Sequence, residues 1–279
     1  MEPAVNVMTP AIVETIRSSI IAGTRRREYD RIPPQISAVL AELHAGIPDT
    51  KRTSYGIVYT VRLLSQYLYT QLAQTGAPVQ KVANAIYAQS VDTKPRSVAL
   101  GMMSFLGPDG LKDTLSCFEA AAASPDWEMR EMAQGLFRRL VGKYPNDVRG
   151  FLHRLSLSPD ANLRRFVAET LRPVQENRWL YQDPEYSLSI LRSMFQERAP
   201  YPRTSVGNNL SDLARRLPEL VCSLVKELVE SGDANSRWIA HRACRNLVKS
   251  DPIRVMDLLR VDEYQYKKRV YRRSDYQRD

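Results

Sequence analysis

Apolar residues recur at three- and four-residue spacing along most of the chain, as in residues 218–231, PELVCSLVKELVES. This spacing places the apolar side chains on one face of an α-helix. The segment opens with Pro218, and proline suits the first position of a helix because its missing N–H would have no partner there. The pattern therefore predicts a series of amphipathic helices, several of which begin at a proline.

The pattern also repeats with a fixed period. Residues 158–164 (SPDANLR) return as residues 231–237 (SGDANSR), and residues 124–130 (SPDWEMR) are a weaker copy. The closing arginine recurs at separations of 34, 34, 34, 39 and 34 residues, at Arg62, Arg96, Arg130, Arg164, Arg203 and Arg237. A fixed period of this length is typical of stacked helix-pair repeats.

Each repeat is predicted to hold two helices. A Ser or Asp before the arginine can cap the first helix, and residues seven and ten positions after the arginine are mostly apolar core positions. Prolines predict the start of the second helix at Pro145, Pro184, Pro218 and Pro252. Pro184 comes late because this repeat has a five-residue insertion within residues 178–183, which explains the separation of 39.

The predicted fold is an all-α, right-handed alpha-solenoid of about six HEAT-like helix pairs over residues 55–260. Tetratricopeptide repeats have a similar period, but their Trp, Leu-Gly and Tyr pattern is absent. Residues 1–54 are expected to form an N-terminal cap, with helices in residues 9–45 around the basic turn at 24–30. Residues 261–279 lack a helical apolar face, so they are predicted to be a flexible, basic, aromatic tail.

A second set of positions predicts a functional face. At 100° per residue, positions 1, 5, 8 and 12 after each arginine point away from the core. They hold Glu131, Arg138, Arg165, Glu169, Arg172, Asn208, Arg215, Trp238, Arg242, Arg245 and Lys249. Arginine binds phosphate bidentately, so this face is predicted to follow a phosphate backbone; the alternative is an ordinary solvated face. The recurring arginine itself is predicted to be structural and to bond carbonyls of the preceding repeat.

Aromatic residues in the insertion offer another candidate contact. Trp179 and Tyr181 could stack on a base, or they could be buried aromatics that fix the loop to its neighbours. Both interpretations stay open. Trp127, at a helix junction, is predicted to belong to the core.

The charge of the chain favours an anionic partner. Its 279 residues include 40 Lys and Arg against 31 Asp and Glu, for a net charge of +9 and a pI near 9.5. Such a balance suits nucleic acid or an anionic membrane surface. Because the apolar stretches are too short to span a bilayer and no signal peptide is evident, a soluble cytoplasmic protein is expected. Three separated cysteines and three histidines predict no disulfide framework, no metal site and no cofactor.

Three segments resemble a known family. Residues 163–173 (LRRFVAETLRP) resemble the Val-Arg-Arg-Leu-x-Ser-Glu-Gly-x-Arg-Pro signature of the AlkC branch of the AlkC and AlkD DNA alkylation repair glycosylases. Residues 203–213 (RTSVGNNLSDL) and 238–249 (WIAHRACRNLVK) are similar to two further family segments in the same order. The resemblance covers roughly residues 120 to 260.

The resemblance implies a HEAT-like solenoid that grips duplex DNA and excises cationic N3- or N7-alkylated bases without a metal. The candidate catalytic residues are therefore Glu131, which most nearly matches the family's catalytic Glu, Asp212, on which a second acidic role falls, and Glu169, the Glu of the signature. Departures occur at residues 134–136 and at Arg242, which replaces a family His.

The predicted function is thus a DNA glycosylase that excises an alkylated or otherwise modified base, expected to be a monomer associated with the bacterial nucleoid. The alternatives are a non-catalytic DNA-structure binder and a protein-interaction scaffold. The predicted DNA contacts are Arg138, Arg165, Arg172, Trp179, Tyr181, Asn208, Trp238, Arg242, Arg245 and Lys249.

Overall fold

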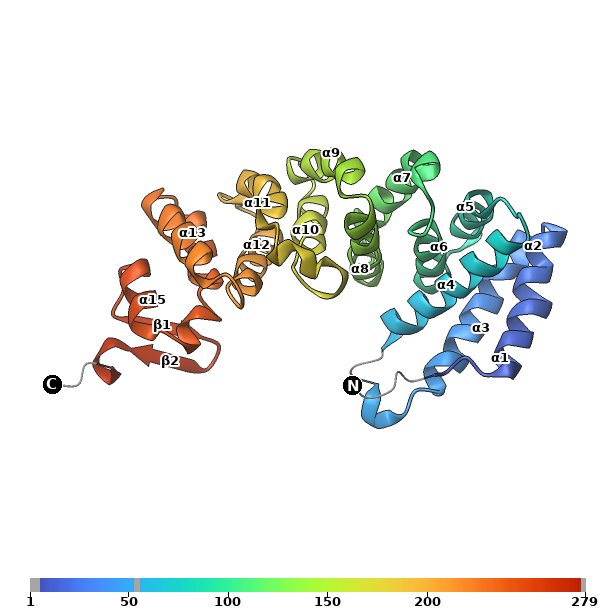
Figure 1. Cartoon of the computed structure of the whole chain (residues 1–279), viewed down its shortest axis with the longest axis horizontal. Coiled ribbons are helices and arrows are strands. Elements are labelled where there is room, and N and C mark those ends of the chain that lie inside the picture. Colours follow the sequence, from blue (N-terminus) through green and yellow to red (C-terminus); the bar gives the residue numbers. More distant parts are fainter. Residues whose placement is uncertain (1–5, 53–55, 277–279) are drawn as a thin grey trace. The chain divides into compact units, whose positions relative to one another are not determined.

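The computed structural model describes residues 6–52 and 56–276, and over these residues the chain forms fifteen α-helices and one β-hairpin (Figure 1). The predicted all-α, HEAT-like class is confirmed. The chain divides into two compact units, Met1–Leu140 and Val141–Asp279, with the boundary inside one helix. Short 3₁₀ segments occur at Tyr29–Arg31, Asp49–Lys51, Pro108–Gly110, Gln175–Tyr181, Arg192–Met194, Leu247–Lys249 and Arg273–Asp275.

The first unit begins with the predicted capping helices. Residues Pro10–Thr15 (α1) run into a π-helical turn, Ile16–Ile21, and then into α2, Ala22–Arg26; Arg27, with φ 60°, ends the helix in the left-handed conformation. The remaining helices are α3 (Ile32–Ala45), α4 (Ile57–Gln74), α5 (Val79–Gln89), α6 (Thr93–Met103), α7 (Leu111–Ala122) and α8 (Trp127–Lys143). The α3, α4 and α5 helices all pack against α6, around a core that includes Leu40, Leu64 and Met103.

The second unit consists of helix pairs with the predicted starts. Its helices are α9 (Pro145–Ser156), α10 (Ala161–Thr170), α11 (Pro184–Leu191), α12 (Pro200–Leu213), α13 (Pro218–Glu230), α14 (Ala234–Ala243) and α15 (Pro252–Leu259). All four predicted proline starts are confirmed. Asp160 and Asp233 cap α10 and α14, accepting hydrogen bonds from the backbone N–H groups of Asn162 and Ser236. These caps pair the exposed N–H groups that open each helix.

The helices of the second unit lie in two rows. In Figure 1, α9, α11 and α13 form one row and α10 and α12 the other. The α12 helix packs between α10 and α14, so each flank of α12 is covered by a neighbouring repeat. This arrangement decides which side chains of α10, α12 and α14 reach solvent.

The recurring arginine does bond carbonyl oxygens. Arg164 Nη1 donates to the carbonyls of Ser158 (2.7 Å) and Pro159 (2.9 Å), and the guanidinium also forms a two-pronged ion pair with Glu197. Carbonyls likewise accept from Arg62 (at Gly135), Arg130 (at Ser124 and Pro125) and Arg237 (at Leu259). The structural role is confirmed for these four. The predicted partner, the preceding repeat, is wrong: the acceptors lie in the loop before the arginine's own helix, in the second helix of the same repeat (Leu259) or in a later repeat (Gly135).

The predicted flexible tail is wrong for residues 263–272. Strands β1 (Glu263–Tyr266) and β2 (Arg269–Arg272) pair antiparallel, with Tyr264 opposite Tyr271. Both tyrosines are buried, and Tyr264 donates a hydrogen bond to the carbonyl of His241 at 2.9 Å. Alternate residues of a strand share a face, so this hairpin buries an aromatic face that a helical wheel does not reveal.

Candidate nucleic-acid interface

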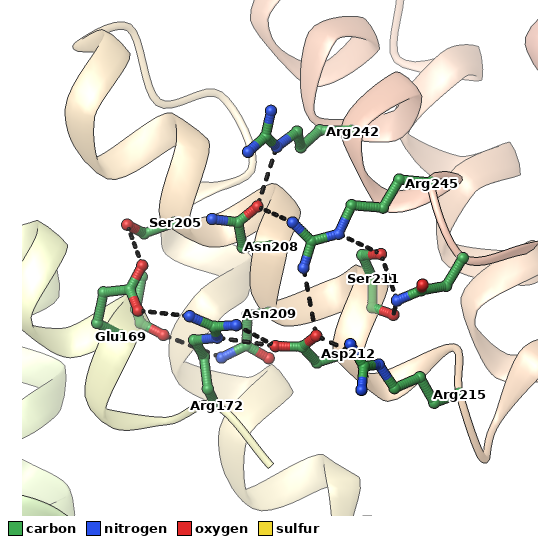
Figure 2. Close-up of polar contacts among 12 residues, drawn as sticks. Glu169, Arg172, Ser205, Asn208, Asn209, Ser211, Asp212, Arg215, Arg242 and Arg245 are labelled. Carbon is green, nitrogen blue, oxygen red and sulfur yellow. Dashed lines mark hydrogen bonds and ion pairs between the residues drawn. The ribbon is translucent and has the colours of Figure 1, made fainter. Parts of the chain in front are cut away.

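A polar network joins α10, α12 and α14 around the buried carboxylate of Asp212 (Figure 2). Asp212 is 2% exposed and accepts hydrogen bonds on Oδ2 from Arg172 Nε (2.8 Å) and Nη2 (2.6 Å). On Oδ1 it meets Arg245 Nη2 at 3.3 Å and Arg215 Nε at 3.6 Å. Three guanidinium groups therefore surround one carboxylate.

Arg172 links Asp212 to a second buried carboxylate, Glu169, which is 5% exposed. Glu169 accepts from Arg172 Nη1 at 3.0 Å and from the hydroxyl of Ser205 at 2.7 Å. Burial opposes ionisation of this carboxyl, but Arg172 and the Ser205 hydrogen bond outweigh it and lower the pKa of Glu169. Conversely, the two carboxylates raise the pKa of Arg172 against the effect of its burial. The carboxyl of Glu169 is thus held ionised.

The network continues from α12 to α14. Asn208 Oδ1 accepts from Arg242 Nε (2.9 Å) and Arg245 Nη1 (2.7 Å), and Arg245 Nε donates to Ser211 Oγ (2.9 Å). Gly207 allows this close approach, because a Cβ at that position would lie 2.5 Å from Cγ of Arg242. The chain therefore needs a glycine where the two helices cross.

The charges of the network do not cancel. Glu169 and Asp212 supply two negative charges, and Arg172, Arg215, Arg242 and Arg245 supply four positive charges, which leaves a surplus of two. Arg215 is largely exposed and Arg242 is half-buried. Guanidinium groups retain N–H donors in a planar fork that matches phosphate. The exposed edge of this network suits an anion.

The predicted outward direction is wrong for three of the charged residues. Arg138, Arg165 and Glu169 are 8%, 9% and 5% exposed. For Glu169, the wheel fails because α12 covers the flank of α10 that the wheel assigns to solvent. Arg165 lies over the ring of Tyr201, 4.2 Å from its centroid.

Glu131 belongs to α8 in the first unit, whereas Asp212 and Glu169 belong to the second. The half-buried Glu131 accepts a hydrogen bond from Gln134 Nε2 at 2.8 Å, and Gln134 Oε1 accepts from Arg138 Nη2 at 2.6 Å. The catalytic role of Glu131 stays a prediction.

The other predicted DNA contacts differ in their surroundings. Arg203 lies over the ring of the half-buried Trp238, 4.6 Å from its centroid. Lys249 is exposed and donates to Asn246 Oδ1 at 3.0 Å.

The aromatics of the insertion pack against the protein. Trp179 meets Tyr186 edge to face, with 5.1 Å between ring centroids, and the hydroxyl of Tyr181 donates to the carbonyl of Asp212 at 3.1 Å. These contacts favour the alternative in which the aromatics fix the loop. The prediction for Trp127 is wrong, since this side chain is 62% exposed at the start of α8.

Several partners in the network were not predicted. Ser205, Ser211 and Tyr266 contact the charged residues but carry no distinctive spacing of their own. Within the described ranges, no group of three or more His, Cys, Asp or Glu side chains is arranged to hold a metal ion. Among the helices described, none has the length and apolar character needed to cross a membrane.

Together, the paired helices and the arginine network across α10, α12 and α14 define an all-α, HEAT-like repeat protein. Among solved structures, the chain is similar to the alkylpurine DNA glycosylase AlkC of Pseudomonas fluorescens bound to DNA containing an abasic site analog. The match has a TM-score of 0.54 and 20% identity and covers 93% of this chain and 69% of that one. The predicted resemblance is confirmed at the level of the fold.

A second solved structure, smu.31 from Streptococcus mutans UA159, matches with a TM-score of 0.50 and 18% identity over 66% of this chain and 98% of that one. Searches with protein-family models and against curated proteins find no match.

Proposed function

We propose that this chain is a DNA glycosylase that binds duplex DNA and releases an alkylated or otherwise modified base. The observation that carries the proposal is the network across α10, α12 and α14, which has two more guanidinium groups than carboxylates. Duplex DNA presents a dense row of phosphates, and arginine is well suited to bind them. The fold similarity to AlkC, a glycosylase bound to DNA, supports the same function.

Release of an alkylated base requires only that the protein position the reacting groups and stabilise the charge that develops on the sugar. An alkylated base already carries a positive charge and leaves readily, so the main requirement is a carboxylate that stabilises the developing oxocarbenium sugar and a positioned water. We assign the carboxylate role to Glu131, which matches the family's catalytic Glu. The negative charges of Asp212 and Glu169 are already compensated by Arg172, Arg215 and Arg245, so we assign the two carboxylates the role of holding the arginines in place.

A catalytically silent DNA binder is the second candidate. It is favoured by the pairing of Asp212 and Glu169 with arginine, because a network with surplus positive charge repels a cationic base and a cationic transition state. The arginines of such a protein would bind phosphates without assisting base release.

The test is base release from duplex DNA that contains an N7-alkylated guanine. We expect the wild-type protein to release the base and Glu131→Gln to slow release by about 10²-fold or more, on the order of 3 kcal/mol, because the carboxylate acts chiefly in the transition state. Duplex affinity, measured by fluorescence anisotropy, should stay equal or rise slightly, since a charge that repels phosphate is removed.

Each outcome separates the candidates. Tight duplex binding by the wild type without release from any N3- or N7-alkylated duplex would favour the binder. Release that survives Glu131→Gln would keep the enzyme but remove Glu131 from the catalytic role. Failure to bind duplex DNA at low salt would refute both. Glu230→Gln, at the exposed end of α13, is the matched control for the loss of a negative charge.

A further inference from the structure

The C-terminal hairpin is fixed to the last repeat. Tyr264 is fully buried, and its ring stacks on His241 with 4.4 Å between centroids. At the far end of β2, Arg273 forms ion pairs with Asp257 of α15 (2.8 Å) and with Asp262 (3.2 Å). In Figure 1 the two strands lie beside α15. Contacts at the base of the hairpin therefore fix its position on the last repeat, and with it the position of the tip.

The next inward-facing residue of β1 connects the hairpin to the arginine network. Tyr266 follows Tyr264 by two positions and shares its face. The guanidinium of Arg242 lies over the Tyr266 ring, 5.5 Å from its centroid. Burial would raise the pKa of the Tyr266 hydroxyl, but a hydrogen bond from Arg245 and the charges of Arg242, Arg245 and Lys267 lower it. The tip thus adjoins the surplus positive charge of the network.

The turn adds three more cations. Lys267, Lys268 and Arg269 are exposed, and no carboxylate within the described ranges pairs with any of them. Arg272 behaves differently, because Glu263 pairs with it at 3.0 Å. The uncompensated charge is therefore concentrated at the tip.

The backbone at the turn also favours a role for the lysine side chain. Lys267 has φ 56°, in the left-handed region where glycine fits at little steric cost and other residues lose about 1–2 kcal/mol. A lysine that occupies such a position costs stability, and strain of this kind gathers at binding sites.

We propose that residues 267–269, at the tip of the hairpin, bind the phosphodiester backbone of duplex DNA beside Arg242 and Arg245. The proposal rests on the proposed duplex binding and adds a second contact to it. The tip offers compact ammonium and guanidinium groups without an apolar wedge, so it recognises charge along the backbone and not the identity of a base.

The experiment measures duplex affinity of the full chain against salt concentration, with a plain, fluorescently labelled duplex. Each lost phosphate contact should lower the slope of log K against log salt by about 0.9. Between 50 and 200 mM salt, a slope lower by 0.9 means that affinity falls about 3.5-fold less for each contact removed, or about 12-fold less for two. We expect this change in the pair Lys267→Gly and Lys268→Gln.

Lys267→Gly is chosen because it removes the charge while relieving the backbone strain, so the hairpin should stay folded. An unchanged thermal melt verifies this, and Lys226→Gln controls for the loss of a remote exposed charge. A wild-type slope that the tip variants leave unchanged would overturn the hairpin proposal alone. No duplex binding by the wild type would instead refute the proposed function, and the hairpin proposal with it.

Discussion

Replacing Arg172 by Met should destabilise the second unit strongly. The change removes the donor of three hydrogen bonds to Glu169 and Asp212, two carboxylates that are each at least 95% buried. Breaking a buried ion pair by removing one partner costs about 3–5 kcal/mol, because a charge is left without compensation. Asp212 keeps Arg245 and Arg215, so the lower end, about 3 kcal/mol, is expected.

The assay is differential scanning calorimetry at neutral pH. For a unit of this size, about 3 kcal/mol corresponds to a fall in melting temperature of roughly 9 °C. Arg192→Met is the matched control. Its ion pair with Glu227 is about half exposed on both sides, so its loss should cost less than about 1 kcal/mol.

A combined variant tests the electrostatic cause. If Arg172→Met is joined with Glu169→Gln and Asp212→Asn, the carboxylates no longer need a cation and part of the lost stability should return. Two results would refute the reasoning: a loss in Arg172→Met no larger than in Arg192→Met, or a triple variant at least as unstable as the sum of its single changes.

Changes at Gly207 of α12 and Glu169 of α10 should also alter the stability of the second unit. Gly207→Ala should lower the free energy of unfolding by about 1–3 kcal/mol, because the new methyl group would lie 2.5 Å from Cγ of Arg242. Gly150→Ala, with open space around it, should raise the free energy of unfolding by about 0.5–1 kcal/mol, and equal effects of the two changes in calorimetry would contradict the packing argument. Because the pKa of Glu169 is lowered in the folded state, ionisation of this carboxyl stabilises the fold at pH values above its ordinary pKa of 4.5. This stabilisation is lost as the pH falls through the folded-state pKa. Urea unfolding between pH 7 and pH 3 should therefore show a smaller loss of stability in Glu169→Gln than in the wild type. If both proteins lost stability equally as the pH falls, Glu169 would not be the source of this pH dependence.

The repeat architecture could be predicted because it depends on local signals. Prolines at Pro145, Pro184, Pro218 and Pro252 each begin a helix, and Asp160 caps the helix that follows it. These signals act over a few residues, through a missing N–H or a side-chain acceptor, so the sequence specifies them directly.

The site could be predicted only in part, because it depends on neighbours that are distant in sequence. A helical wheel separates the core side of α10 from its opposite side, yet it contains no information on α12, which covers Glu169. Tyr264 and Tyr266 show a period of two that indicates a strand, but the Lys267 turn lacks the Gly or Asn that usually marks a hairpin. The hairpin could not be predicted because its turn has a lysine, Lys267, in the left-handed conformation that usually indicates Gly or Asn.

Arg245 is held in place on three sides, by Asn208, Ser211 and Asp212. A free arginine side chain has about 2 kcal/mol of rotamer entropy, and much of this is lost when an anion immobilises it. In this protein the loss occurs during folding, so the guanidinium is pre-organised before any ligand arrives. An anion that binds at this edge would meet a receptor with little conformational freedom left to lose, and its affinity would gain accordingly.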